Sequence, residues 1–438
     1  MRAWSFGTCP MAKRYAKTAT MSDTQNNMDL KDKSVLCIDN GLFVSLAERL
    51  SKDFGKVGYY YDWQSGFPDG RELIIGEGIE GVERVKYLWD VINDYDLIVF
   101  PDCWHSDMQE YLRRLGKRVW GTGNGAELEL RRWKTHELLP SIGLDQNKAV
   151  LLNGISALRE YLESHDEQFV KISMYRGIGE TWHSPNIEMA EGMLREISDK
   201  CGPLADVIDF IVEESVPDAV EIGYDGYCID GKFPDKAVVG IERKDKSYFG
   251  RLCAYDALPE NVRKVNDALA GVISQYQYRQ FFSTEIREKG SKAYLIDLTC
   301  RHPSPAGEVE MMMFENLAEI LWEGADGRLV NPVTKFKYGA QIIIKSEWYS
   351  AGHYQPITFP EEIRPFVKIY NHCRIGGMDY AVPQLADMAQ IGSVVALGNT
   401  PEETVKKCKE MAEQVKGFDI ETEADSLDEA VSELEESL

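Results

Sequence analysis

Two hydrophobic periods alternate along residues 34–125. Apolar runs of strand length, such as 34–39 and 96–102, are separated by segments such as 42–54, in which apolar residues recur at helical spacing. Strands that alternate with helices are typical of a doubly wound parallel sheet, whose ligands bind in a crevice at the carboxyl ends of the strands. We therefore expect an N-terminal α/β domain with a binding crevice at that edge.

Four residues are placed by this pattern at the expected crevice. Asp39, Asn40 and Gly41 stand at the end of the first strand and Asp102 at the end of a later one, so we expect them to contact a substrate. An equally good interpretation of Asp39 is that its carboxylate caps the next helix. The first strand is not followed by a Gly-x-Gly-x-x-Gly pattern, which argues against a dinucleotide-dependent oxidoreductase.

A lysine stands inside an apolar strand in the second part of the chain. Lys171 lies in the strand pattern of 169–173, and the loop after it carries Gly177 and Gly179. A buried ammonium group is costly without an anionic partner, and glycines let backbone amides approach such an anion. We therefore predict that Lys171 and this loop bind an anion.

Residues 281–302 predict a hairpin of two strands with Lys289–Gly290 at its turn. Glu285 and Asp297 then lie on neighbouring strands, where they are within reach of one another if they point to the same face. Adjacent carboxylates repel each other unless a cation lies between them, and Mg²⁺ favours one or two carboxylates together with nucleotide phosphates. Arg301, just beyond the second strand, could hold an anionic oxygen by a bidentate contact. The alternative is an exposed Arg–Asp pair of little energetic value.

Composition narrows the class of protein. The 438 residues carry 49 Lys and Arg against 72 Asp and Glu, a net charge of −23 without a compensating basic stripe, so no nucleic-acid partner is expected. No apolar run approaches the ~20 residues of a membrane span. The nine cysteines form no Cys-x-x-Cys pair, which indicates reduced thiols in a cytoplasmic protein rather than a zinc site.

Both ends of the chain differ in composition from the middle. Residues 1–33 are expected to form a disordered leader, because the first twenty carry four basic residues, no acid and no continuous apolar run. Residues 418–438 contain nine acids and no Lys or Arg. We expect them to form a solvated, partly helical acidic tail.

Several stretches in this order resemble the ATP-grasp superfamily and, within it, the phosphoribosylamine–glycine ligases (glycinamide ribonucleotide synthetases). They are RVWGTGNGAELE at 118–129, FVK at 169–171, FIVEESVPDAVEI at 210–222, YLIDLTCRHPSPAGE at 294–308 and GSVVALGNTPEETVKKCKEMAEQV at 392–415. The resemblance implies a Rossmann-like domain over 34–125, an ATP-grasp domain of two lobes over 126–330, and a small C-terminal α+β domain over 331–417.

The resemblance also implies the chemistry. ATP would phosphorylate a carboxylate, and an amine would displace phosphate from the acylphosphate. Mg²⁺, with Mn²⁺ as the alternative ion, would be held by Glu285, Asp297 and Thr299. ATP contacts are implied for Lys171, Gly177, Gly179, Glu213, Glu214, Glu221 and Arg131, and catalytic roles for Lys171, Arg243 and Arg301.

Two loops that hold the acceptor in the resembling family are different here. They read DNGLFV at 39–44 and KDKSYFGRLCAYD at 244–256, and they have lost most of their glycines. Lys246 and Arg251 nevertheless put positive charge in the second loop, so we predict an anionic, phosphorylated acceptor. Glycine with phosphoribosylamine is the leading substrate pair and would belong to purine biosynthesis. A solvated charged loop is the alternative interpretation.

The sequence therefore predicts a cytoplasmic, ADP-forming carboxylate–amine ligase that is a monomer or homodimer and acts on small molecules. The alternative is a nucleotide-binding protein of the same fold without turnover. Thr299, in a position where the resembling family has a stronger metal ligand, and the altered loops are consistent with that alternative.

Overall fold

The structure is a computed structural model that describes residues 28–61, 74–172, 180–217, 219–383 and 388–437. Within these ranges no helix is long and apolar enough to cross a membrane. The expected fold class, a parallel N-terminal sheet followed by antiparallel sheets in an α/β chain, is confirmed.

The N-terminal sheet is parallel and has the strand order β3-β2-β1-β4-β5. Its elements are β1 (Ser34–Asp39), α1 (Val44–Leu50), β2 (Lys56–Tyr61), β3 (Glu83–Arg84), α2 (Leu88–Val91), β4 (Leu97–Val99), α3 (Ser106–Arg114) and β5 (Arg118–Trp120). Every residue of β1 is buried, as expected of a central strand that is covered on both faces. The strand order changes direction between β1 and β4, so a crevice is expected at their carboxyl ends.

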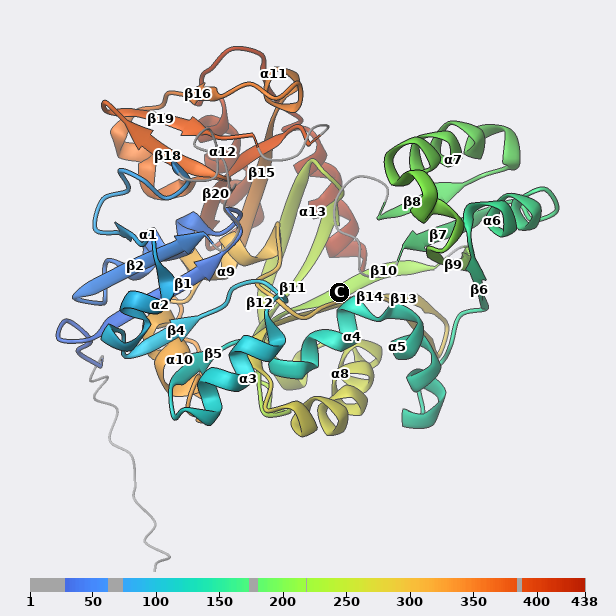
Figure 1. The fold of residues 1–438 in the computed structure, drawn as a ribbon, viewed down its shortest axis with the longest axis horizontal. Helices are drawn as coiled ribbons and strands as arrows, with labels where there is room; N and C mark the ends of the chain where they lie inside the picture. The colour runs from blue at the N-terminus through green and yellow to red at the C-terminus, as the bar shows by residue number, and fades with distance from the viewer. Residues whose placement is uncertain (1–27, 62–73, 173–179, 218, 384–387, 438) are drawn as a thin grey trace, which may run out of the picture.

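A four-stranded antiparallel sheet and two helices form a lobe that stands apart from the rest of the molecule (Figure 1). Its elements are β6 (Ala149–Asn153), α6 (Ile155–Leu162), β7 (Gln168–Ile172), β8 (Thr181–Ser184), α7 (Ile187–Cys201) and β9 (Asp209–Glu214); the short helices α4 (Glu127–Leu130) and α5 (Arg132–Leu138) precede it. Val170 and Ile172 of β7 belong to the core beneath the helices. Lys171 alternates with them and therefore points from the other face of the lobe.

The largest sheet has nine strands. Its elements are β10 (Val220–Ile229), β11 (Lys236–Arg243), β12 (Ser247–Ala254), β13 (Arg279–Lys289), β14 (Lys292–Thr299), β15 (Tyr338–Ser346), β17 (Val367–Ile369), β20 (Gln390–Gly398) and β21 (Ile420–Thr422). On one face, Val239 and Phe249 pack in a core that includes helix α8 (Glu260–Ile273). On the other face, Val238 and Tyr248 pack with helices α9 (Ala306–Met313) and α10 (Leu317–Gly324).

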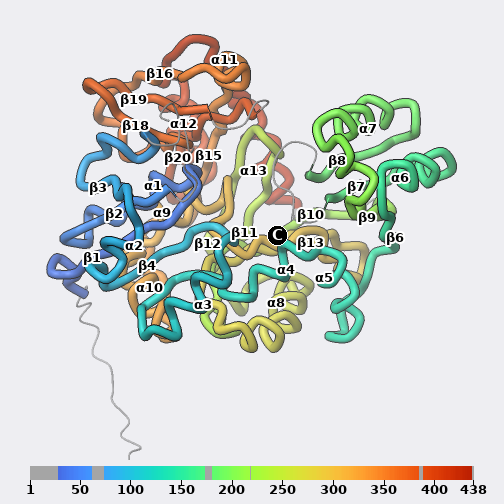
Figure 2. Tube along the Cα trace, in the orientation of Figure 1, coloured from blue at the N-terminus to red at the C-terminus, as the bar shows by residue number. Residues whose placement is uncertain are grey.

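The C-terminal part of the chain continues this sheet, since β12 pairs with β15 and β15 with β20. It adds helix α12 (Pro401–Ala412) and a small sheet of β16 (Gln355–Ile357), β18 (His372–Ile375) and β19 (Met378–Ala381). Figure 2 shows the orange strands β18 and β19 beside the blue N-terminal domain, and the N–H of Asn371 donates to the carbonyl oxygen of Gly41 at 2.8 Å. The domain boundaries given above stay a prediction.

The acidic C-terminal segment is packed on the large sheet, so the expectation of a solvated tail is wrong. Residues 420–422 form β21, and helix α13 (Ser426–Ser437) follows. Leu427, Ala430 and Leu434 are at most 2% exposed and belong to the core that contains α8. Their spacing gives α13 an apolar stripe. The overall composition of the segment, which is rich in acids, does not reveal this stripe.

Candidate active site

The hairpin of β13 and β14 carries the predicted metal ligands Glu285 and Asp297, which are direct partners across the two strands. The register shifts at this point, because Ile286 pairs with Leu295 and Ile296 is an extra residue in β14. Without this bulge, Glu285 would face Ile296, and Asp297 would point to the other side of the sheet. The bulge therefore puts both carboxylates on one face.

Negative charge is concentrated on this face of the sheet. Strand alternation puts three further carboxylates there: Glu221, Asp225 and Glu242. Burial, and then the charge of Asp297, raise the pKa of Glu285 well above its ordinary value. Burial raises the pKa of Glu242 to about 8. A bound cation would relieve this repulsion.

Glu285 and Asp297 fit the way in which proteins hold Mg²⁺, which usually keeps several waters and binds one or two carboxylates together with substrate phosphates. The described residues contain no group of three or more His, Cys, Asp or Glu side chains arranged to hold a metal ion on their own. Thr299 lies two residues beyond Asp297 on β14, opposite Ser283. Its hydroxyl adds a neutral oxygen to the same face.

A cavity of about 390 Å³ lies between β14, the lobe, and helices α4 and α5. Lys171 lines it with a side chain that is only 6% exposed and an ammonium nitrogen 3.1 Å from the Glu213 carboxylate. The same nitrogen donates to the carbonyl oxygen of Ile296, the bulge residue, at 2.6 Å. Lys171 thus ties the lobe to the hairpin. Gly177 and Gly179 lie outside the described residues.

The arginine that lines the cavity beside Lys171 is Arg132 rather than the predicted Arg131. Its guanidinium pairs with Glu180 and lies 3.8 Å from the Asp297 carboxylate. Burial disfavours this cation, but Asp297 and Glu180 outweigh burial and raise the pKa of Arg132. Arg131 is exposed and lies 3.9 Å from Glu127. The cavity residues of this segment recur at helical spacing, a signal that the sequence contains: Arg132, Thr135, His136 and Leu139.

Arg301 is held by Glu129, a residue of the 118–129 stretch for which the sequence predicts no role. Its Nε donates to Glu129 at 3.0 Å, and the other oxygen of Glu129 accepts the Cys300 N–H at 2.6 Å. Burial opposes the Arg301 charge, yet nearby carboxylates, Asp102 and Asp297 among them, raise the pKa of Arg301. Arg301 is therefore a fixed cation whose charge reaches both Asp297 and the N-terminal crevice residue Asp102.

Arg243, which the sequence predicts to be catalytic, lies on the face of the large sheet opposite to the acidic face. It follows Glu242 in β11, so alternation turns its side chain to the opposite side of the sheet. There its guanidinium lies 2.6 Å from Glu433 of α13. The positive charge of Arg243 suggested a catalytic role, whereas the alternation of side chains along β11 excludes Arg243 from the acidic face.

The predicted acceptor residues Lys246 and Arg251 also lie away from the acidic face. The Lys246 ammonium is 2.7 Å from Glu423, in the C-terminal segment. Arg251 is directly opposite Val239, and Val239 packs in the core on the far side of the sheet from the carboxylates. These two cations therefore do not form an anion site on the acidic face.

The two remaining predicted ATP contacts are Glu214 and Glu221. The Glu214 carboxylate is half-exposed and lies 3.2 Å from Lys148. Glu221 lies 2.9 Å from Arg287 on the acidic face. Glu221 therefore shares a surface with Glu285 and Asp297, whereas Glu214 lies outside the residues that line the cavity.

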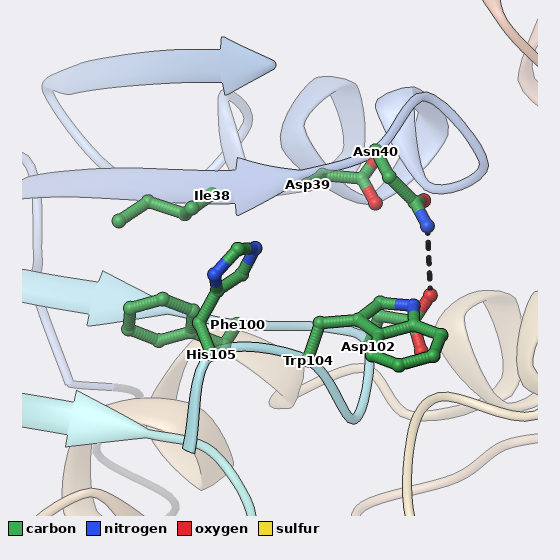
Figure 3. A pocket seen from close by; sticks show the side chains of 7 residues that line it. All are labelled: Ile38, Asp39, Asn40, Phe100, Asp102, Trp104 and His105. Carbon is green, nitrogen blue, oxygen red and sulfur yellow. Dashed lines mark hydrogen bonds between the residues drawn. The ribbon is translucent and has the colours of Figure 1, made fainter. Parts of the chain in front are cut away.

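A crevice of about 200 Å³ lies at the carboxyl ends of β1 and β4 (Figure 3). Asp39 and Asn40 form one wall, and Asp102, Trp104 and His105 form the other. The amide of Asn40 donates to Asp102 across the crevice at 3.1 Å. Asp39, Asn40 and Asp102 therefore lie together at the crevice, as expected from the strand pattern.

Asp39 also has the structural role that was the alternative interpretation. One of its oxygens accepts the N–H groups of Gly41 and Phe43 and the Tyr59 hydroxyl, at 3.2, 2.8 and 2.8 Å. Burial, partly offset by these hydrogen bonds, raises the pKa of Asp39 to about 6. Gly41 adopts a φ of +107° in this turn and is not among the residues that line the crevice. Gly41 therefore has a role in the turn, and its contact with a substrate stays a prediction.

Comparisons with known proteins agree with this fold. No family model matches the sequence, and no curated protein matches it. Phosphoribosylamine–glycine ligase from Thermotoga maritima is similar in structure, with a TM-score of 0.65, 14% identity, and coverage of 88% of this chain and 98% of that one.

Two further solved structures are similar over most of their length. The biotin carboxylase domain of 2-oxoglutarate carboxylase from Hydrogenobacter thermophilus has a TM-score of 0.63 and 12% identity, covering 90% of this chain and 92% of that one. L-amino acid ligase from Bacillus licheniformis has a TM-score of 0.56 and 15% identity, covering 89% and 99%. The chain thus has the ATP-grasp fold that its motifs resemble.

Proposed function

We propose that this protein is an ATP-dependent, ADP-forming ligase that joins a carboxylate to an amine. The observation that carries the proposal is the cavity in which Lys171, Arg132 and Asp297 meet beside Glu285. Two largely buried cations beside a pair of carboxylates suit a polyphosphate with a divalent cation, because the cations attract the phosphates and the carboxylates attract the divalent ion.

Each of these residues has a role in the proposed reaction. Glu285 and Asp297 would hold Mg²⁺, which would supply positive charge against the phosphates. Lys171 and Arg132 offset the remaining phosphate charge and orient the transferred group. Arg301, fixed by Glu129, donates to a carboxylate or acylphosphate oxygen.

The enzymes of similar structure support an ATP-dependent ligase reaction in general. They include a phosphoribosylamine–glycine ligase, an L-amino acid ligase, and a biotin carboxylase domain in complex with MgADP and bicarbonate. Phosphoribosylamine itself fits this chain poorly, because Lys246 and Arg251 are turned away from the acidic face. The proposed amine acceptor is therefore a compound other than phosphoribosylamine.

The experiment is a screen of amino acids and amines in pairs, with Mg²⁺ and ATP, for ADP release and for a product whose mass is that of both substrates minus water. Asp297→Asn should abolish both signals, and Asp267→Asn, which changes an exposed carboxylate on α8, should leave both unchanged. AMP instead of ADP would contradict the proposal.

A nucleotide-binding protein without turnover is the second candidate. The observation that favours it is Thr299, a neutral group at the third predicted metal position. Under that function, MgADP binds to the full chain and depends on Lys171, but no pair of substrates increases ADP formation.

A further inference from the structure

The charges around the N-terminal crevice indicate an acceptor of the opposite sign from the one that the sequence predicts. We propose that the amine substrate is a small organic ammonium compound without a phosphate group, and that it binds between Asp39, Asn40 and Asp102. This inference rests on the proposed ligase function, since it names the chemical class of that reaction's acceptor.

The first observation is a buried carboxylate oxygen that lacks a partner. Asp39 is 2% exposed, and its Oδ1 has no hydrogen-bond partner in the described structure, whereas Oδ2 accepts three hydrogen bonds. A buried acceptor without a donor is unfavourable, so a ligand that brings an N–H group is stabilised here. Figure 3 shows the Asp39 side chain at the crevice, which residues at the ends of β1 and β4 enclose.

The second observation is the arrangement of the opposite wall. The Asp102 oxygens accept from the Asn40 amide at 3.1 Å and from the Cys103 N–H at 2.6 Å, so the carboxylate is fixed in place. A carboxylate has about four lone-pair sites and can accept a further donor. Trp104 lies beside Asp102 on this wall, and an indole face attracts an ammonium group.

The third observation concerns positive charge. No Lys or Arg is among the described residues that line the crevice, and its one imidazole, His105, is exposed. Arg301, whose charge reaches Asp102, is already bound to Glu129. A phosphate in the crevice would therefore meet two carboxylates, whereas an ammonium group would meet two acceptors.

The test compares two probes that differ only by a phosphate: ethanolamine and O-phosphoethanolamine. Each is titrated into the full-length protein with MgADP present, by calorimetry at about 0.15 M salt, where exposed charges are screened beyond ~8 Å. Saturable binding of ethanolamine, tighter than that of O-phosphoethanolamine, is expected. Asp102→Asn should weaken ethanolamine binding by about ten- to a hundredfold, the value of one hydrogen bond to a charged group.

Two variants make the result specific to the crevice. Asp107→Asn removes the same charge from an exposed position in the first turn of α3, outside the lining, and should leave the affinity for ethanolamine unchanged. Asp39→Asn should weaken ethanolamine binding as Asp102→Asn does. Asp39 also holds the turn before α1, so if Asp39→Asn does not fold, the result for Asp102→Asn decides the test.

The outcomes separate this inference from the proposed function. If MgADP binds but ethanolamine does not, or if O-phosphoethanolamine binds more tightly, the ammonium acceptor is refuted and the ligase is not. An equal loss of affinity in Asp107→Asn would also refute it, because binding would then follow net charge. If MgADP itself does not bind, the proposed function fails.

Discussion

Replacing Lys171 with Met is expected to weaken ATP binding and, separately, to lower the stability of the protein without nucleotide. The ammonium group is 3.1 Å from the Glu213 carboxylate, and the two side chains are 6% and 13% exposed. At this distance, attraction in a medium of effective dielectric about 20 is about 5 kcal/mol, most of which offsets the desolvation of both ions.

The net change in stability depends on the polar groups that lose their partner when Lys171 is replaced. Lys171→Met leaves Glu213 buried without its cation and the Ile296 carbonyl without its donor, so the free energy of unfolding should fall by about 2–4 kcal/mol. The phosphates lose one charged hydrogen bond, so the Kd for ATP should rise by about ten- to a hundredfold. Adding Glu213→Gln should restore part of the stability, because it removes the unpaired charge, but it should not restore the affinity for ATP.

Urea unfolding measures the stability, and calorimetry measures the affinity. Lys148→Met is the matched control, since Lys148 pairs with Glu214 at 3.2 Å on the surface of the same lobe. That pair should contribute less than about 1 kcal/mol, and its loss should leave ATP affinity unchanged. If Lys171→Met destabilised the protein and ATP bound as before, Lys171 would be a structural ion-pair residue and not a phosphate ligand.

Three further predictions test other parts of the structure. Glu285→Gln should abolish Mg²⁺-dependent ADP formation without lowering the thermal midpoint, because it removes one of two repelling carboxylates; normal turnover that still needs Mg²⁺ would exclude this ligand. Burial raises the pKa of Glu308 from 4.5 to about 7, so the stability that this group contributes at low pH is lost as pH rises through that interval. The stability of Glu308→Gln relative to the original protein should therefore increase by about 3 kcal/mol between pH 4.5 and 8 in urea unfolding, and a constant difference would mean that Glu308 titrates normally. Leu434→Ala should cost about 2–4 kcal/mol in the same assay, whereas a negligible loss would mean that α13 is not packed as described.

Local patterns in the sequence were sufficient to predict much of the fold. The apolar run at 34–39 predicts β1, and the turn near Gly290 predicts the hairpin of β13 and β14. Both predictions succeed because strand period and turn residues are properties of a few neighbouring positions. The same hairpin brought Glu285 and Asp297 to adjacent strands. Whether they share a face depends on one extra residue, Ile296, and no turn signal in the sequence marks that bulge.

The predicted site differs from the structure where the register of a helix or strand, and not the charge of a residue, decides which side chain reaches the site. Arg131 and Arg132 are adjacent in sequence, and only the helical register of α5 decides which one reaches the cavity. Arg243 is cationic and close in sequence to the acidic face, but its position in β11 turns it toward α13. Glu129 was missed because its partner, Arg301, is 172 positions away in the chain.

The central claim, that the protein forms ADP while joining a carboxylate to an amine, is tested most directly by product analysis. The full chain is incubated with ATP, Mg²⁺ and a mixture of amino acids and small amines, and nucleotides and new amides are quantified by mass spectrometry. We expect ADP and one amide in equal amounts, and neither when the carboxylate or the amine is left out. ADP formation that is independent of both substrates, or an amide accompanied by AMP, would contradict the account.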